Sequence, residues 1–150
     1  MKLTTISIKA FRLHADTTIT FPPTGIIGLL GSNESGKSTV LEAATWALFG
    51  GDATRGTKAG IRWHGAPARK TASVELGFEI GGRRLSVFRD ESDAVLREMD
   101  ADGGSSIIAK GVAAVNKLVP QVLGLSYNEF CASFFVRQKD VSRLATLLPT

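Results

Sequence analysis

The sequence has one cysteine and no long apolar run, and each shortage removes a class of protein. With Cys131 as the single cysteine among 150 residues, an internal disulfide framework is excluded, which fits the reducing cytoplasm. No apolar segment reaches the roughly 20 residues of a membrane-spanning helix, so we expect no membrane partner. The excess of one charge sign is also small: a net charge of +4 permits a polyanionic partner such as DNA without requiring one.

The apolar content is that of a folded domain. Hydrophobic residues make up 43% of the chain, enough for one compact domain with a sizeable core. Alternating apolar and polar residues predict half-buried strands, a continuous apolar run predicts a strand buried on both faces, and helical periodicity predicts helices. We expect half-buried strands over residues 6–8, 17–21, 74–80, 83–89 and 94–99, the fully buried strand over residues 26–30, and helices over residues 36–49 and 112–122.

Glycine, proline and capping residues divide these elements. Gly50 and Gly51 are expected to end the first helix, and residues 52–72 to form a long basic loop. The second helix is expected to follow the turn at residues 102–104 directly, with Pro120 kinking or ending it. The last expected elements are a short helix capped by Ser126 with Glu129, a strand over residues 134–136 and a helical turn over residues 144–148.

The segment from Gly31 to Ser38 carries the most specific motif of the chain. It reads Gly-Ser-Asn-Glu-Ser-Gly-Lys-Ser and matches G-x-x-x-x-G-K-[ST] in full, between an expected buried strand and an expected helix. Glycines let backbone N–H groups turn towards phosphate oxygens, and the positive end of the helix dipole points at the same place. A ligand-free Gly/Ser-rich turn is the alternative, but motif and context together favour a phosphate-binding loop.

The residue types in this loop assign roles in binding ATP with Mg²⁺. Lys37 is expected to reach the β- and γ-phosphates, the Ser38 hydroxyl to bind Mg²⁺, and Thr39 to donate to the α-phosphate. The remaining predicted ATP-binding residues of the loop are Asn33, Glu34, Ser35 and Gly36. We therefore expect ATP and Mg²⁺ as the cofactors.

Other polar residues are ambiguous when they are taken alone. Gln138 follows an apolar run, but a lone glutamine is usually a surface residue. Arg12 and His14 flank a turn between two expected strands and, without more context, are solvated side chains. The basic loop over residues 52–72 suits adenine, phosphate or DNA, and equally suits no ligand at all.

A resemblance to one family connects these separate features. The segments that carry it are residues 1–3, Lys9-Ala10-Phe11-Arg12 with His14 and Asp16, residues 31–39, Leu41-Glu42-Ala43, residues 46–50 and Phe135-Val136-Arg137-Gln138. Together they resemble the N-terminal ATPase segment of the SbcC-type DNA double-strand-break repair ATPases. That family belongs with the structural-maintenance-of-chromosomes (SMC) proteins in the ABC ATPase class. The resemblance spans nearly the whole chain, and its Phe-Arg-x-His and Phe-Val-Arg-Gln elements are more specific than the phosphate loop.

The resemblance implies a fold and further site residues. The fold is an α/β P-loop NTPase, the N-terminal lobe of an ABC-type head. In it an antiparallel β subdomain, including the hairpin over residues 74–89, packs on the strand–helix core of the phosphate loop. Arg12 contacts nucleotide phosphate, and Gln138 touches Mg²⁺ and the attacking water, so that Lys37 and Gln138 are the catalytic candidates. The residues on the adenine side are Thr57, Lys58 and Ala59.

The same resemblance implies partners. Family members bind DNA across paired heads, which makes Arg62, Arg83 and Arg84 the candidates for facing DNA. The expected partners are the protein's own C-terminal ATPase half, a second copy in a head dimer, a nuclease subunit and DNA. The expected location is therefore the nucleoid in the cytoplasm.

Glu34 departs from the family pattern. The family loop commonly has glycine at this position, so a carboxylate here is expected to lie near the phosphates and weaken binding. Its presence also predicts that the position does not need a positive φ. The departure bears on the subfamily among SMC-like ATPases and not on the class.

The sequence lacks two features that ATP hydrolysis needs in this class. No run of four or more apolar residues ends in Asp-Glu, the carboxylate pair that holds Mg²⁺ and polarises the attacking water. Asp90 and Glu91 follow an expected hairpin strand, and there is no Leu-Ser-Gly-Gly signature. In the family both features lie beyond a long coiled coil. We therefore expect residues 1–150 to be the N-terminal half of a head, with negligible turnover of ATP on its own.

Three alternatives remain open at this point. A nucleotide-binding subunit of an ABC transporter shares the loop, but usually has an aromatic residue before it and lacks the Phe-Arg-x-His element. A small P-loop kinase needs a lid and an acceptor site, and neither is evident. A non-catalytic, ATP-gated interaction module is the third.

Overall fold

The computed structural model describes residues 1–53, 58–67 and 70–133. In chain order the strands are β1 (Lys2–Phe11), β2 (His14–Thr20), β3 (Ser73–Ile80), β4 (Arg83–Asp90), β5 (Ala94–Met99) and β6 (Ser105–Lys110). The helices are α1 (Lys37–Phe49), the short 3₁₀ helices η1 (Gly50–Ala53) and η2 (Lys58–Ile61), α2 (Val112–Leu123) and α3 (Tyr127–Ser133). Within these residues no helix is both long and apolar enough to cross a membrane.

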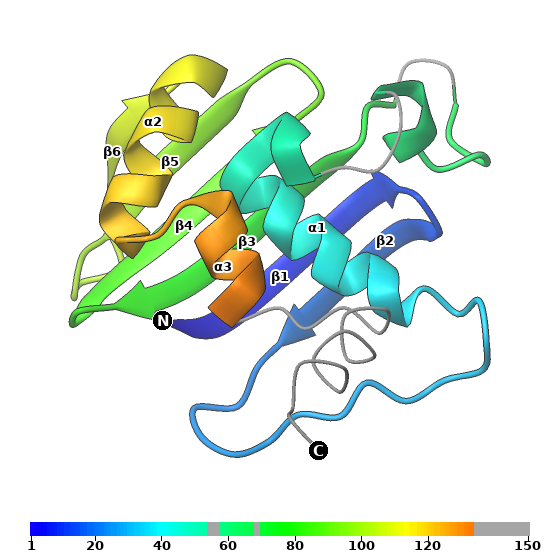
Figure 1. Ribbon diagram of the computed structural model, residues 1–150, viewed down its shortest axis with the longest axis horizontal. Helices are drawn as coiled ribbons and strands as arrows, with labels where there is room; N and C mark the ends of the chain where they lie inside the picture. Colours follow the sequence, from blue (N-terminus) through cyan, green and yellow to red (C-terminus); the bar gives the residue numbers. More distant parts are fainter. Residues whose placement is uncertain (54–57, 68–69, 134–150) are drawn as a thin grey trace, which may run out of the picture.

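The strands form a single antiparallel sheet in the order β2-β1-β3-β4-β5-β6 (Figure 1). Gly81 and Gly82 connect β3 to β4, and both have positive φ, the conformation that a tight two-residue hairpin turn favours. The central strands β1, β3 and β4 therefore lie side by side although β3 is 62 residues from the end of β1 in sequence.

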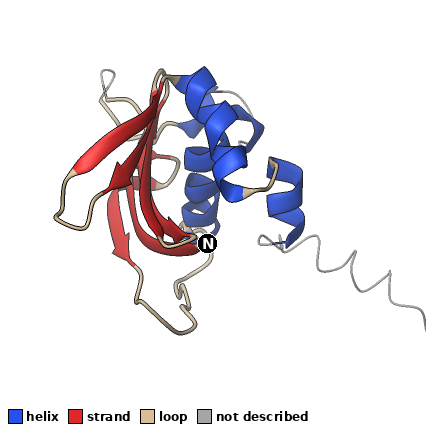
Figure 2. Ribbon diagram, turned by 90° about the vertical axis from the view of Figure 1, so that its left-hand side faces the viewer, coloured by secondary structure: helices blue, strands red, loops and turns tan. Residues whose placement is uncertain are grey.

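Helices cover one face of the sheet and leave the other face open (Figure 2). Alternate residues of the strands point into the covered face, where Ile6, Ile8, Leu76, Val87 and Leu96 are fully buried. The side of α1 that faces the sheet carries Val40, Ala43, Trp46 and Ala47, and the rings of Phe11 and Trp46 lie 5.2 Å apart. Burial of a side chain as large as valine or phenylalanine contributes roughly 1.5–3 kcal/mol, so this contact fixes α1 on β1 and β3.

Arg89 joins the helices to the sheet at the end of α1. Its side chain is only 2% exposed, and burial lowers the pKa of the guanidinium to about 10. The Nε atom donates to the carbonyl of Ala47 at 3.0 Å, and the second guanidinium nitrogen donates to Asn116 Oδ1 at 2.7 Å. One strand residue therefore holds the last turn of α1 and the middle of α2 together.

Most expected elements are confirmed. Gly50 ends α1 with a φ of 67°, and Ser126 and Glu129 form the predicted capping box, with each backbone N–H bonded to the other's side chain. Helix α2 continues past Pro120 to Leu123, so the proline does not end it. The expected loop over residues 52–72 contains η1, η2 and a bridge between Phe11 and Arg62. The elements expected at 134–136 and 144–148 lie outside the described residues.

Two expectations about strands are wrong. Residues 26–30 form no strand, and Ile26 and Leu30 are fully exposed, because every strand of the described part belongs to the antiparallel sheet and none pairs with this run. Strand β6, which pairs with β5, stands where the second helix was expected to begin directly. Its exposed Ile107 and its serines produce no clear alternation.

Candidate nucleotide-binding site

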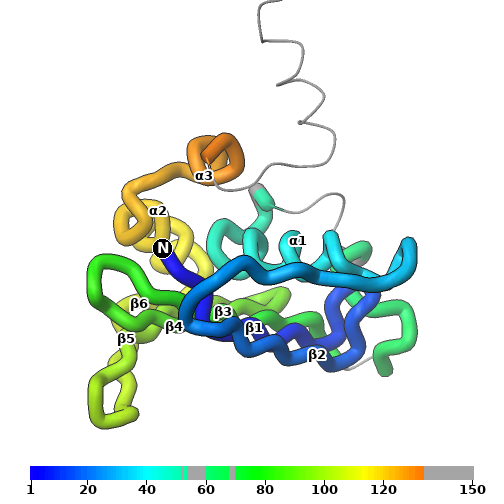
Figure 3. Tube along the Cα trace, turned by 90° about the horizontal axis from the view of Figure 1, so that it is seen from below, coloured from blue at the N-terminus to red at the C-terminus, as the bar shows by residue number. Residues whose placement is uncertain are grey.

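The phosphate loop ends at Gly36, where α1 begins. Figure 3 shows the segment before α1 passing from the sheet layer to the helix layer. Gly36 has a φ of 89°, and no side chain caps the helix at this residue. A Cβ at Gly36 would lie 2.8 Å from Nε2 of His14, so the position requires glycine on both conformational and steric grounds. The first N–H groups of α1 are thereby left facing the loop, the arrangement that binds anions.

The expectation that Glu34 does not need a positive φ is wrong. Its φ is 67°, in the left-handed region, so the position does take a positive φ although the residue is not glycine. At Gly31 an added Cβ would lie 2.6 Å from Oγ of Ser35, which keeps that position free of side chains. The loop therefore has left-handed bends at Glu34 and Gly36, and a carboxylate stands at the first of them.

Lys37 closes the loop from its own helix. The Nζ atom donates to the carbonyls of Gly31 at 2.7 Å and Ser32 at 2.6 Å, and lies 3.4 Å from Oγ of Ser35. A cation is thus held across the loop by two backbone carbonyls, which are weaker partners than phosphate oxygens. The lysine is positioned for exchange of those carbonyls for an anion.

The other predicted site residues of the loop differ in how far they are exposed. Asn33, Glu34, Ser35 and Ser38 are exposed, whereas Thr39 is buried and its N–H donates to the carbonyl of Gly36 at 3.0 Å. Residues 1–53, 58–67 and 70–133 contain no group of three or more His, Cys, Asp or Glu side chains that could hold a metal ion.

Arg12 lies beside α1 and is held there by several groups. Its guanidinium donates to Glu42 Oε1 of α1 at 2.6 Å and to the carbonyl of Gly60 at 2.9 Å. The backbone N–H of Arg12 donates to the carbonyl of Ile61 at 2.6 Å, and the residue has a φ of 52°. Arg12 therefore connects β1, α1 and η2, and its contact with nucleotide phosphate stays a prediction.

The remaining residues predicted from the resemblance are only partly placed. Lys58 and Ala59 open η2, the turn that Arg12 holds, but their side chains are not described. Thr57 and Gln138 lie outside the described residues. Their roles on the adenine side and at Mg²⁺ stay predictions.

His14 is a site residue to which the sequence analysis assigned no role. Its Nε2 lies 3.1 Å from the carbonyl oxygen of Gly36, and its Nδ1 lies 2.9 Å from Oγ1 of Thr17. The signal was present in the Phe-Arg-x-His element, but nothing in the sequence says that the imidazole meets the start of a helix 22 residues later.

Comparison with known proteins decides the family. A family model described as an AAA domain matches residues 5–144. The chain belongs to this AAA domain family. Its α/β architecture, an antiparallel sheet packed on the helix after the phosphate loop, is the one expected for the N-terminal lobe of an ABC-type head.

Relatives over nearly the whole chain confirm the expected resemblance. The DNA double-strand break repair Rad50 ATPase of Methanocaldococcus jannaschii is 31% identical and aligns with 100% of this chain and 14% of its own length. The SbcC subunit of the nuclease SbcCD of Deinococcus radiodurans is 28% identical over 96% of this chain and 17% of its own length. The chromosome partition protein Smc of Methylococcus capsulatus is 29% identical over 99% of this chain and 13% of its own length. The AAA domain thus spans a small part of each of these proteins.

A solved structure is also similar to part of the AAA domain. The SMC head domain from Thermotoga maritima matches 71% of this chain and 36% of its own chain, with 22% identity and a TM-score of 0.39.

The three arginines predicted to face DNA already have partners within the AAA domain. Arg62 is paired with Glu91 through two bonds of 2.9 and 2.6 Å, and Arg83 with Glu98 through two bonds of 2.7 and 2.8 Å. Those contacts raise the pKa of both guanidinium groups. Arg84 donates to the carbonyl of Asp100 at 2.7 Å. A DNA phosphate would have to compete with these partners, and the DNA contact stays a prediction.

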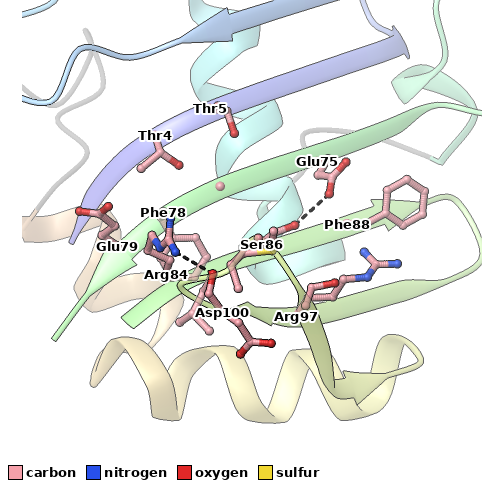
Figure 4. Close-up of a pocket in the computed structure, with 15 residues that line it drawn as sticks. Thr4, Thr5, Glu75, Phe78, Glu79, Arg84, Ser86, Phe88, Arg97 and Asp100 are labelled. Carbon is pink, nitrogen blue, oxygen red and sulfur yellow. Dashed lines mark hydrogen bonds between the residues drawn. The ribbon is translucent and has the colours of Figure 1, made fainter. Parts of the chain in front are cut away.

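A hollow on the open face of the sheet lies away from residues 31–39. It measures about 740 Å³ and lies opposite α1 (Figure 4). Arg84 and Arg97 line it together with the carboxylates of Glu75, Glu79 and Asp100, so its charge is mixed. That composition does not favour a polyanion.

Asp90 and Glu91 are structural carboxylates. Asp90 Oδ1 accepts from the N–H groups of Ser92 and Asp93, each at 2.7 Å. Glu91 binds Arg62 and accepts from the N–H of Ala72 at 2.8 Å. The hydrogen bond from Arg62 holds the pKa of Glu91 below its ordinary value. The prediction that the run before this pair, Leu85 to Arg89, is a hairpin strand is confirmed.

Proposed function

We propose that residues 31–39 bind Mg-ATP and that the chain is the N-terminal half of the head of a DNA-repair or chromosome-maintenance ATPase. The observation that carries the proposal is the cation of Lys37 held across a complete phosphate-loop motif at the uncapped start of α1. The names of the relatives support the wider role, since one is a DNA double-strand break repair ATPase and another is a chromosome partition protein.

Binding follows from exchange of partners in the loop. Lys37 leaves the carbonyls of Gly31 and Ser32 for the β- and γ-phosphates, and the N–H groups at the start of α1 donate to phosphate oxygens. The exposed hydroxyl of Ser38 adds one ligand to the Mg²⁺ that enters with the nucleotide, since Mg²⁺ in such sites is bound mainly by phosphates and waters. Bound Mg²⁺ would neutralise phosphate charge, and Arg12 and Gln138 would complete the set of residues predicted from the family.

The exposed apolar run before the loop indicates that a strand from another part of the protein pairs with it. Ile26 and Leu30 are fully exposed and Ile27 is 44% exposed, in a segment whose composition suits a strand buried on both faces. We infer that strands of the C-terminal ATPase half cover this run and carry the Asp-Glu pair. The completed head would then dimerise and bind DNA and a nuclease subunit.

The test is the affinity of Lys37→Ala for Mg-ATP, measured by calorimetry. Loss of a charge-assisted contact of roughly 1.5–3 kcal/mol predicts an affinity at least tenfold weaker, down to no measurable binding, with the fold retained. Lys9→Ala removes an exposed lysine from β1 and is the matched control, expected to bind like the parent. Equal affinities for Lys37→Ala and the parent would refute the nucleotide site.

A further inference from the structure

His14 connects the sheet to the phosphate loop. It is the first residue of β2 and pairs with Phe11 across a two-residue turn. Arg12 in that turn is held by hydrogen bonds to Glu42, Gly60 and Ile61, so the backbone that carries His14 is anchored. From there its ring reaches Gly36, the residue at which the loop becomes α1.

The hydrogen bonds at His14 define which ring nitrogen carries the proton. A backbone carbonyl can only accept, so Nε2 must be protonated to bond Gly36 at 3.1 Å. In the neutral ring with this tautomer Nδ1 is an acceptor, and the hydroxyl of Thr17, 2.9 Å away, is placed to donate to it. Thr17 therefore keeps the imidazole in the form that holds the loop.

Few hydrogen bonds in the described part connect the loop to other elements as the His14 bond does. In the described part, the hydrogen bonds of Gly31, Ser32 and Ser35 stay within the loop and its lysine. The carbonyl of Gly36, by contrast, accepts from Thr39, Val40 and His14 together. The nearest imidazole atom, Nε2, lies 2.8 Å from the position that a Cβ at Gly36 would take, so the ring packs directly against the left-handed bend.

We propose that His14 is a positioning residue of the nucleotide site, which orients Gly36 and the first N–H groups of α1 towards phosphate. The proposal rests on the nucleotide-binding function proposed above. Its physical basis is preorganisation: a loop held in its binding conformation loses less conformational freedom when the anion arrives. His14 touches no phosphate itself and acts through Gly36.

The test exploits the different reach of two amides. Glutamine can place its N–H₂ group near the position of Nε2, whereas asparagine reaches only the position of Nδ1. Loss of one neutral hydrogen bond predicts that His14→Ala binds Mg-ATP roughly 2- to 13-fold more weakly. We expect His14→Gln to bind within about twofold of the parent and His14→Asn to bind like His14→Ala. Thr17→Val should show a smaller loss, since it removes only the group that fixes the tautomer.

Affinity by calorimetry is compared with unfolding in urea for every variant. Rescue by glutamine but not by asparagine, at equal stability of the two variants, supports the proposal, and comparison of these two remains decisive if His14→Ala does not fold. Equal affinities for glutamine and asparagine variants, or losses of affinity that merely follow losses of stability, overturn it. If the parent binds Mg-ATP and Lys37→Ala does not, but all His14 variants bind like the parent, only the His14 proposal fails. If the parent does not bind, the proposed function fails with it.

Discussion

Glu34 combines an unfavourable backbone conformation with an unfavourable charge. Its φ of 67° lies in the region that disfavours residues with a Cβ by roughly 1–2 kcal/mol. Its exposed carboxylate belongs to a loop that we propose to bind a polyanion. The first effect acts on folding and the second on binding, so substitutions can separate them.

We predict that Glu34→Gly raises the free energy of unfolding by about 1 kcal/mol and also tightens the binding of Mg-ATP. Glycine relieves the strain and removes the charge together. Glu34→Gln removes only the charge, and is expected to tighten binding with no gain in stability. Urea unfolding and calorimetry on both variants measure the two effects. A glycine variant no more stable than the glutamine variant would show that the backbone is not strained at this position.

At the scale of elements, Arg89 joins α1, α2 and β4 through one buried cation. Its two acceptors, the carbonyl of Ala47 and Oδ1 of Asn116, belong to different helices. A Cβ at Gly50 would lie 2.8 Å from the guanidinium, so the helix end and the arginine are packed closely. The pairing therefore sets how α2 lies against α1.

We predict that Arg89→Met lowers the free energy of unfolding by roughly 1–3 kcal/mol, because methionine retains apolar volume but leaves buried acceptors unsatisfied. Urea unfolding measures the loss. Arg84→Met, the same change at an exposed arginine, is the control and should cost much less. The double variant Arg89→Met, Asn116→Leu should recover part of the loss. A cost for Arg89→Met no greater than that of the control would contradict the role given to the buried contacts.

Elements whose determinants are local could be predicted from the sequence. The hairpin turn at Gly81 and Gly82 needs positive φ, and the capping box of Ser126 and Glu129 closes within one helical turn. The stop of α1 at Gly50 has the same local origin. Each of these signals lies close in the chain to the structure that it specifies.

Features that depend on distant partners could not be predicted. The run over residues 26–30 has the composition of a buried strand, but a strand forms only where another pairs with it. Within the site, the loop and Lys37 follow from the motif alone, whereas the contact of His14 with Gly36 joins two elements 22 residues apart. The prediction that position 34 has no positive φ was wrong because it took glycine as the source of the positive φ. The course of the loop imposes this φ on Glu34 instead.

At the scale of the whole molecule, binding and hydrolysis are expected to separate. The two adjacent acidic residues Asp90 and Glu91 are used to hold a turn and the basic loop. The sequence has no apolar run that ends in Asp-Glu and no Leu-Ser-Gly-Gly segment. We therefore propose that this chain alone binds ATP but turns it over negligibly, and that turnover needs the C-terminal half.

Gln138 is the residue expected to affect hydrolysis most while affecting the binding of ATP least. Its amide is uncharged, so it adds little to the affinity for ATP, but it can accept from a water and offer its oxygen to Mg²⁺. We predict that Gln138→Ala leaves the affinity within roughly threefold and, once the C-terminal half is supplied, lowers turnover at least tenfold through lost positioning. Calorimetry and phosphate release on the same preparation measure both, with Lys37→Ala as the control that should lose binding and turnover together. Steady turnover by this chain alone that Lys37→Ala abolishes would refute the need for a second half. Parental turnover by the completed Gln138→Ala head would make Gln138 an ordinary surface residue.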